Sequence, residues 1–156
     1  MRYLAIDLGD KRTGLAVGDD LTRVVSPMGA VEVPVERQDG EALLDAVAAA
    51  VLEHLGPPVR GGAGAEVVVG LPLNMDGSEG PRAKQVREFA ARLAARTGRA
   101  VRLQDERLSS AEADWAMARS GLTRGQKKAR RDALAAAAIL KDYLAGLGSG
   151  EPGPGT

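Results

Sequence analysis

Short apolar runs, each bounded by glycine, proline or charged residues, dominate the first part of the chain. Residues 2–8 form one such run, and residues 14–18 form a second one after the polar turn at 10–12. A third strand is expected in two pieces, at 24–25 and 30–35, because Pro27 interrupts the pattern. Three successive strands with short links predict an antiparallel meander.

The middle of the chain alternates between two periodicities. Apolar residues recur every three to four positions over 41–55 and again over 81–97, which predicts two amphipathic helices. Between and after them, residues 66–70 and 100–104 predict two strands. The first of these is apolar without alternation, which favours a strand buried on both faces. We expect the glycine-rich stretch 56–64 to be a flexible loop.

The last third of the chain has the pattern of helices, interrupted by a segment with a strong excess of positive charge. A helix is expected from Ser109 or Ser110 to Ala118, followed by a polar, cationic segment over 123–131. An alanine-rich helix is expected from 132 to 147, so Asp132 would stand at its start. Residues 148–156 are rich in glycine and proline, and we expect them to be disordered.

This order of elements predicts an α/β fold. The first three strands pair as hairpins, and the later strand–helix units add parallel strands by right-handed crossovers. The expected result is a mixed five-stranded sheet flanked by helices. Ligands in such sheets bind outside the carboxyl ends of the strands. Asp7 and Glu106 lie at two such ends.

Composition narrows the class of protein. A length of 156 residues predicts one domain, here placed at 1–147. The absence of cysteine excludes disulfides and thiolate metal sites. No apolar stretch approaches the roughly 20 residues that span a bilayer, so no membrane partner and a cytoplasmic location are expected. Acidic and basic residues balance at 21 each, so any nucleic-acid footprint must come from local clustering.

Three acidic residues are the candidate catalytic and metal-binding groups: Asp7, Glu106 and Asp132. Carboxylates at two strand ends and one helix start can converge on a divalent cation, and Mg²⁺ or Mn²⁺ prefers such hard oxygen ligands. Each acid alone also has an ordinary structural explanation. Asp7 could form a turn, Glu106 could pair with Arg102 or Arg107, and Asp132 could cap its helix.

Cations gather near these acids. Because positive charge at a helix start opposes the macrodipole, the run before Asp132 favours phosphate contacts over a purely structural role. A solvated basic loop remains the alternative. The candidate nucleic-acid-binding residues are Lys11, Arg12, Arg107, Arg124, Lys127, Lys128, Arg130 and Arg131.

Several strings resemble one known family. These strings are similar to the YqgF family, also called RuvX. They are residues 5–9 and 13–17, Gly-Leu-Pro-Leu-Asn-Met-Asp-Gly at 70–77, Asp-Glu-Arg-Leu-Ser at 105–109, and Asp132 with the alanine-rich sequence that follows it. That family is described as Holliday-junction-resolvase-like and as a nuclease that matures the 5′ end of pre-16S rRNA. The match runs in order over roughly residues 2–145.

The resemblance implies an RNase H-like fold, divalent-metal catalysis, and catalytic roles for the same three acids. Related resolvases of the RuvC type carry a further acid at the end of the fourth strand, where this chain has Val69-Gly70. A three-carboxylate site is therefore implied, with Glu106 supplying the ligand from the fifth strand.

The leading hypothesis is thus a metal-dependent endonuclease acting on precursor ribosomal RNA, within a ribosomal precursor particle, or on four-way DNA junctions. A junction resolvase would cut symmetrically and so act as a homodimer. The turn at 7–14 also looks like that of actin-like ATPases, but such enzymes need two domains and the chain is too short. A non-catalytic RNA-binding module is the third class.

Overall fold

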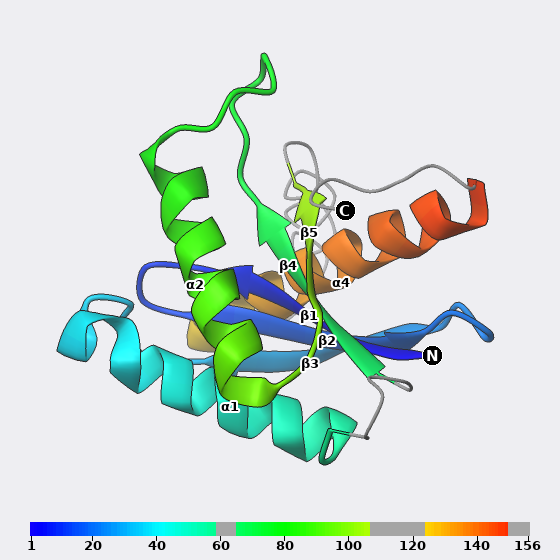
Figure 1. The fold of residues 1–156 in the computed structure, drawn as a ribbon, viewed down its shortest axis with the longest axis horizontal. Coiled ribbons are helices and arrows are strands. Elements are labelled where there is room, and N and C mark those ends of the chain that lie inside the picture. Colours follow the sequence, from blue (N-terminus) through cyan, green and yellow to red (C-terminus); the bar gives the residue numbers. More distant parts are fainter. Residues whose placement is uncertain (59–64, 107–123, 150–156) are drawn as a thin grey trace.

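The structure is a computed structural model, and it describes residues 1–58, 65–106 and 124–149, with the side chains of the last segment described over 128–147. Five strands form a single twisted sheet, and helices cover both of its faces (Figure 1). The described architecture is the mixed α/β sheet that the sequence predicts.

The sheet has the order β3-β2-β1-β4-β5. Strands β1 (Arg2–Leu8), β2 (Thr13–Asp19) and β3 (Val25–Val31) pair antiparallel, which confirms the meander. Strands β4 (Ala65–Leu71) and β5 (Val101–Asp105) extend the sheet parallel to β1. The carboxyl ends of β1, β4 and β5 therefore meet at one edge of the sheet.

The prediction for the third strand was wrong in its boundaries. β3 is continuous from Val25 to Val31 and passes through Pro27, whereas residues 32–36 form a loop. Proline has no N–H to donate to a neighbouring strand. Pro27 is tolerated because β3 is an edge strand of the described sheet, where a backbone N–H on the outer side would have no strand to pair with. The register between β2 and β3 shifts between Gly14 and Ala16, which accommodates the irregularity.

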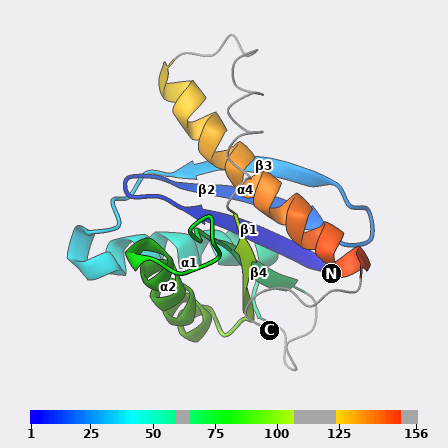
Figure 2. The ribbon, with the colours of Figure 1, turned by 90° about the horizontal axis from the view of Figure 1, so that it is seen from above.

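The described helices lie on both faces of the sheet (Figure 2). Helix α1 (Glu41–Leu55), entered through the short 3₁₀ turn η1 (Arg37–Gly40), and α2 (Pro81–Thr97) pack against one face. Helix α4 (Arg124–Ser149) crosses the other face. Leucine and valine fill the first interface, while the second is built largely from alanine with Ile139 and Leu140.

Helix α4 corrects the predicted start of the last helix. It begins at Arg124, so the cationic run is helical and Asp132 lies two turns inside the helix rather than at its start. Lysine and arginine are good helix formers, and no proline interrupts them. The yellow N-terminal turns of α4 project beyond the sheet (Figure 2).

The remaining boundaries differ little from expectation. The predicted helix from Ser109 or Ser110 to Ala118 lies outside the described residues, as do 59–64. Helix α4 continues to Ser149, two residues into the predicted tail, and 150–156 are outside the described part. Among the described helices, none is both long enough and apolar enough to cross a bilayer.

Candidate active site at the strand ends

Asp7 is the penultimate residue of β1, opposite Gly14 of β2. Alternation along β1 places Asp7 on the same face as Tyr3 and Ala5, which contact α4. A Cβ atom on Gly14 would lie 1.9 Å from the backbone oxygen of Asp132. The backbone of α4 therefore rests directly on β2 at Gly14, and this close approach brings Asp132 to the end of β1.

Glu106 follows the last residue of β5. Its N–H donates a hydrogen bond of 3.2 Å to the Leu71 carbonyl at the end of β4, which fixes the backbone as it leaves the sheet. Its carboxyl group lies over Gly70, where a Cβ atom would be 2.7 Å from Oε2 of Glu106. The absence of a side chain at Gly70 thus makes room for the Glu106 carboxyl.

The Asp7 and Glu106 carboxyls share a hydrogen bond in which Glu106 is the donor. Burial, the neighbouring Asp7 charge and this hydrogen bond raise the pKa of Glu106 to about 9. Burial also raises the pKa of Asp7; the hydrogen bond from Glu106 opposes that rise and the charge of Asp132 adds to it. The nearby positive charges of the protein therefore do not balance the negative charge that these acids would carry if all were ionised. A bound cation stabilises such an arrangement.

Asp132 is close enough to act on Asp7 electrostatically, but it is engaged by an arginine. Nε of Arg12 donates a hydrogen bond of 2.8 Å to Oδ2 of Asp132, and both side chains are partly buried. Within the described segments, no three acidic or histidine side chains form a ready-made metal cluster. Two of the predicted acids are in contact, and the third lies beside them in an ion pair.

The ordinary structural explanations for the acids are partly excluded. Asp132 is no helix cap, because α4 starts eight residues earlier. Arg102 pairs with Glu66 at 3.4 Å rather than with Glu106. Arg107, the other proposed partner of Glu106, lies outside the described residues.

The sequence reasoning missed Arg82, in the first turn of α2. Its Nη2 donates to the Leu8 carbonyl at 2.6 Å, and its Nη1 donates to Oδ1 of Asp10 at 2.8 Å. Its positive charge lowers the pKa of both Asp7 and Glu106. A cation in the first turn of a helix opposes the macrodipole. The same argument that singled out the cations of residues 124–131 could therefore also have identified Arg82.

The predicted nucleic-acid-binding cations fall into three groups. Lys11 is exposed in the β1–β2 turn, whereas Arg12 in the same turn is partly buried against Asp132. Lys128, Arg130 and Arg131 are exposed on the early turns of α4. The backbone of Arg124 and Lys127 belongs to the start of α4, but their side chains, and all of Arg107, lie outside the described part.

The loop between β4 and α2 rises from the same edge of the sheet (Figure 1). Hydrogen bonds within the loop brace it: Asn74 Nδ2 donates to Ser78 Oγ at 3.0 Å, and the Ser78 N–H and hydroxyl both donate to Oδ1 of Asp76. Leu73 packs partly against the core, whereas Met75 is 74% exposed. Leu73 is thus tucked back against the core, whereas Met75 is presented to solvent.

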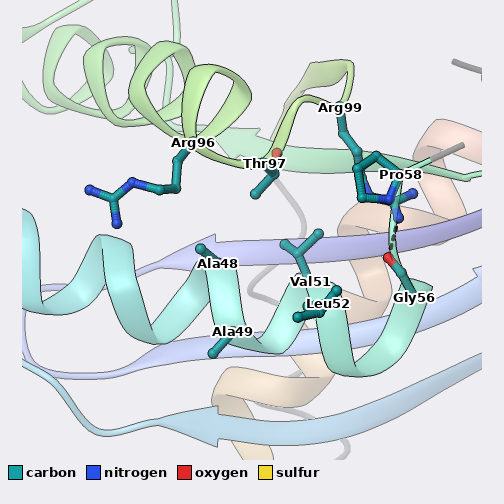
Figure 3. A pocket seen from close by; sticks show the side chains of 9 residues that line it. All are labelled: Ala48, Ala49, Val51, Leu52, Gly56, Pro58, Arg96, Thr97 and Arg99. Atoms are coloured by element: carbon teal, nitrogen blue, oxygen red, sulfur yellow. Dashed lines mark hydrogen bonds between the residues drawn. The ribbon is translucent and has the colours of Figure 1, made fainter. Parts of the chain in front are cut away.

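A hollow of about 400 Å³ between α1 and α2 is a different feature (Figure 3). Arg99 closes one side by donating hydrogen bonds to the carbonyls of Gly56 and Ala65. Because Ala65 begins β4, the hollow lies at the end of the strand opposite to Gly70 and Leu71. Among the described residues that line it, none is acidic. The hollow therefore has no part in the carboxylate site.

Comparisons with known proteins agree with this geometry. A protein of Anaeromyxobacter sp. (strain Fw109-5) named "Putative pre-16S rRNA nuclease" is 44% identical over 147 residues, which cover 94% of this chain and 98% of that protein. An Escherichia coli O1:K1 / APEC protein of the same name is 37% identical over 141 residues, covering 90% and 94%.

Solved structures show the same fold at low identity. Thermus thermophilus RuvC in complex with a Holliday junction substrate superposes with a TM-score of 0.57 at 15% identity, covering 98% of this chain and 99% of that one. The fowlpox virus resolvase with Holliday junction DNA gives a TM-score of 0.57 at 11% identity, covering 94% and 99%. The fold is thus RNase H-like.

The RuvX family model, described as Holliday junction resolvase, matches residues 1–146. The match covers all the described strands and helices except the last three residues of α4, and it includes Asp7, Glu106 and Asp132. The chain therefore belongs to the RuvX family, and it is a nuclease.

Proposed function

We propose that the chain is a divalent-metal-dependent endonuclease that hydrolyses phosphodiester bonds in structured nucleic acid. Asp7, Glu106 and Asp132 are the proposed catalytic and metal-binding residues. The observation that carries the proposal is the hydrogen-bonded pair of partly buried carboxyls, Asp7 and Glu106, with the Asp132 charge beside it.

The donor set suits Mg²⁺ or Mn²⁺. All three candidate ligands are carboxylates, and hard divalent cations of this kind bind through few carboxylates, water and substrate phosphate. When bound, such an ion activates water for attack on the phosphorus and stabilises the leaving oxygen. The strand ends hold Asp7 and Glu106 rigidly, and Asp132 is presented by a helix packed directly on β2.

The chain's own cations would hold the nucleic acid. Lys11 is exposed in the turn that follows β1, and the exposed Lys128, Arg130 and Arg131 lie on the helix that carries Asp132. Phosphate neutralisation by such clusters supplies most of the non-specific affinity for nucleic acid. Of the cations not fully described, Arg107, Arg124 and Lys127 remain proposed members of this surface.

The proposed substrate is the 5′ region of a pre-16S rRNA within a ribosomal precursor particle. The names of the relatives from Anaeromyxobacter and Escherichia coli support this choice. The description of the family model favours a second candidate, the four-way DNA junction. That activity requires paired, symmetric cuts and would therefore need a homodimer.

Cleavage assays separate these possibilities. Purified protein would be given an end-labelled precursor-rRNA 5′ leader and a four-way DNA junction, each in Mg²⁺, Mn²⁺ or EDTA. The variants are Asp7→Asn and Asp132→Asn, with Asp142→Asn as a control, because Asp142 is an exposed acid farther along α4.

We expect metal-dependent cutting of the RNA leader, at least about 100-fold slower in Asp7→Asn and Asp132→Asn and unchanged in Asp142→Asn. Symmetric nicks on the junction alone would assign the resolvase activity instead. Cutting that survives EDTA, or that all three variants retain, would contradict the proposed site.

A further inference from the structure

Arg82 of α2 lies at the end of β1, 74 residues away in sequence from its backbone partner there. Its guanidinium spans three acceptors: Nη2 donates to the Leu8 carbonyl at 2.6 Å, and Nη1 donates to Oδ1 of Asp10 and to Oε1 of Gln85, both at 2.8 Å. The side chain is 31% exposed; its hydrogen bond to the Leu8 carbonyl is partly buried, whereas those to Asp10 and Gln85 are exposed.

The first two acceptors flank the catalytic strand end. Leu8 is the residue after Asp7 and the last residue of β1, and Asp10 begins the turn that leads to Arg12. The backbone of Asp10 is itself tied down, because its carbonyl accepts a hydrogen bond of 2.9 Å from the Val35 N–H. Arg82 thus joins α2 to the segment that carries Asp7 on one side and Arg12 on the other.

This placement is not explained by the stability of α2 alone. Arg82 is the second residue of the helix, where the macrodipole disfavours positive charge. A lysine could not make the same contacts, because only the planar guanidinium presents several donors in fixed directions. The positive charge of Arg82 also favours the ionised forms of Asp7 and Glu106. Its charge and its hydrogen bonds thus both act on the site at the end of β1.

We propose that Arg82 is a positioning residue for the nuclease reaction. It clamps the end of β1 and the following turn to the first turn of α2, and so holds the Asp7 carboxylate against Glu106. This inference rests on the proposed function. Because Arg82 acts through Asp7, its loss should slow the chemical step and leave nucleic-acid affinity unchanged.

The test compares Arg82→Gln and Arg82→Lys with Arg87→Gln, a control in the same helix. Arg87 is exposed and pairs with Glu79 instead of with the strand end. Single-turnover cleavage of the precursor-rRNA leader in Mg²⁺ gives the rate of the chemical step, and a binding titration in Ca²⁺ gives the affinity. Amide hydrogen exchange of residues 8–12 reports the clamp itself, without any need for activity.

For Arg82→Gln we expect a rate at least about tenfold lower, since small displacements of reacting groups have effects of this size or larger, with affinity within about twofold of the wild type. Exchange at residues 8–12 should rise. The cleavage rate and the exchange of Arg82→Lys should lie between those of the wild type and of Arg82→Gln. Arg87→Gln should match the wild type in every measurement. If Arg82→Gln does not fold, Asp10→Asn removes the negative charge of one exposed partner, which weakens its hydrogen bond with Arg82, and should show a smaller change in the same direction.

Two results would overturn the inference. Lost affinity with an unchanged rate would make Arg82 a phosphate ligand, and unchanged exchange in both Arg82→Gln and Asp10→Asn would show that no clamp exists. If the wild type cuts neither nucleic acid, the proposed function fails, but hydrogen exchange still decides whether the clamp exists.

Discussion

Gly70 gives the carboxyl of Glu106 its place: a Cβ atom at Gly70 would lie 2.7 Å from Oε2 of Glu106 and 2.4 Å from Cδ1 of Ile139. The end of β4 bears no side chain at Gly70, and the Glu106 carboxyl, from the residue after β5, occupies the space that a side chain there would fill.

Gly70→Ala should therefore damage the site and the core together. The added methyl group must displace Glu106, Ile139 or both, and such overpacking costs about 1–3 kcal/mol of unfolding free energy. We expect a lower denaturation midpoint and slower cleavage. Gly146→Ala is the matched control: apart from its chain neighbours and the nearby backbone of its own helix, no atom of the described residues lies within 4 Å of its Cβ position in α4, so it should stabilise the protein by about 0.5–1 kcal/mol and leave cleavage unchanged.

Gly14→Ala should be more severe than Gly70→Ala. Its Cβ atom would lie 1.9 Å from the backbone oxygen of Asp132 and 2.3 Å from the carbonyl carbon, and backbone atoms cannot rotate away. Helix α4 must then lift off β2, which moves Asp132 away from Asp7. We expect a loss of about 3 kcal/mol or more by chemical denaturation. Equal losses for the two variants would argue against the direct seating of α4 on β2.

Glu106→Gln should change the pH dependence of stability in metal-free buffer. Because the pKa of Glu106 is raised to about 9 in the folded protein, the unfolded chain loses this proton first as pH rises from the ordinary value near 4.5. The folded state is therefore progressively destabilised by this group between about pH 4.5 and pH 9. The glutamine variant should gain melting temperature relative to the wild type at pH 8, with little difference at pH 4.5, as measured by calorimetric scans in EDTA.

Arg12→Gln should separate metal binding from nucleic-acid binding. The 2.8 Å ion pair with Asp132 competes with a cation for the same carboxylate. A partly exposed pair of this kind is worth up to about 1 kcal/mol, so Mg²⁺ should bind up to about fivefold more tightly to the variant in calorimetry. Affinity for the RNA leader should fall. Lys11→Gln, which removes a neighbouring exposed cation, should leave Mg²⁺ affinity closer to the wild-type value.

Much of the fold follows from local patterns. The helices at 41–55 and 81–97 were predictable because each has one clear periodicity and glycine or proline at its ends, and the strands between and after them were predictable as short runs rich in valine and leucine. The early start of α4 was mispredicted because a run of lysine and arginine suggested a loop, although both residues favour helix.

The structure brings two of the three predicted acids into contact, whereas the groups that surround them were not predicted. Asp7 and Glu106 are recognisable in the sequence as acidic residues at the ends of short apolar runs. The roles of Gly14, Gly70 and Arg82 depend on contacts between distant segments, such as the crossing of α4 over β2. No local pattern encodes which backbone will rest on a given glycine, so the roles of Gly14 and Gly70 emerge only from the tertiary structure, whereas Arg82 carries the local signal of a cation in the first turn of a helix.

The most direct test of the central claim is a calorimetric titration of Mn²⁺ into the wild-type protein at pH 7 in buffers of different ionisation enthalpy. If Asp7, Glu106 and Asp132 form the metal site, binding must displace the proton that Glu106 donates to Asp7, so we predict release of about one proton per site. Asp7→Asn and Asp132→Asn should bind Mn²⁺ more weakly, whereas Asp142→Asn should behave as the wild type. Binding without proton release, or wild-type binding in the Asp7→Asn variant, would contradict the assignment of the metal to these three carboxylates.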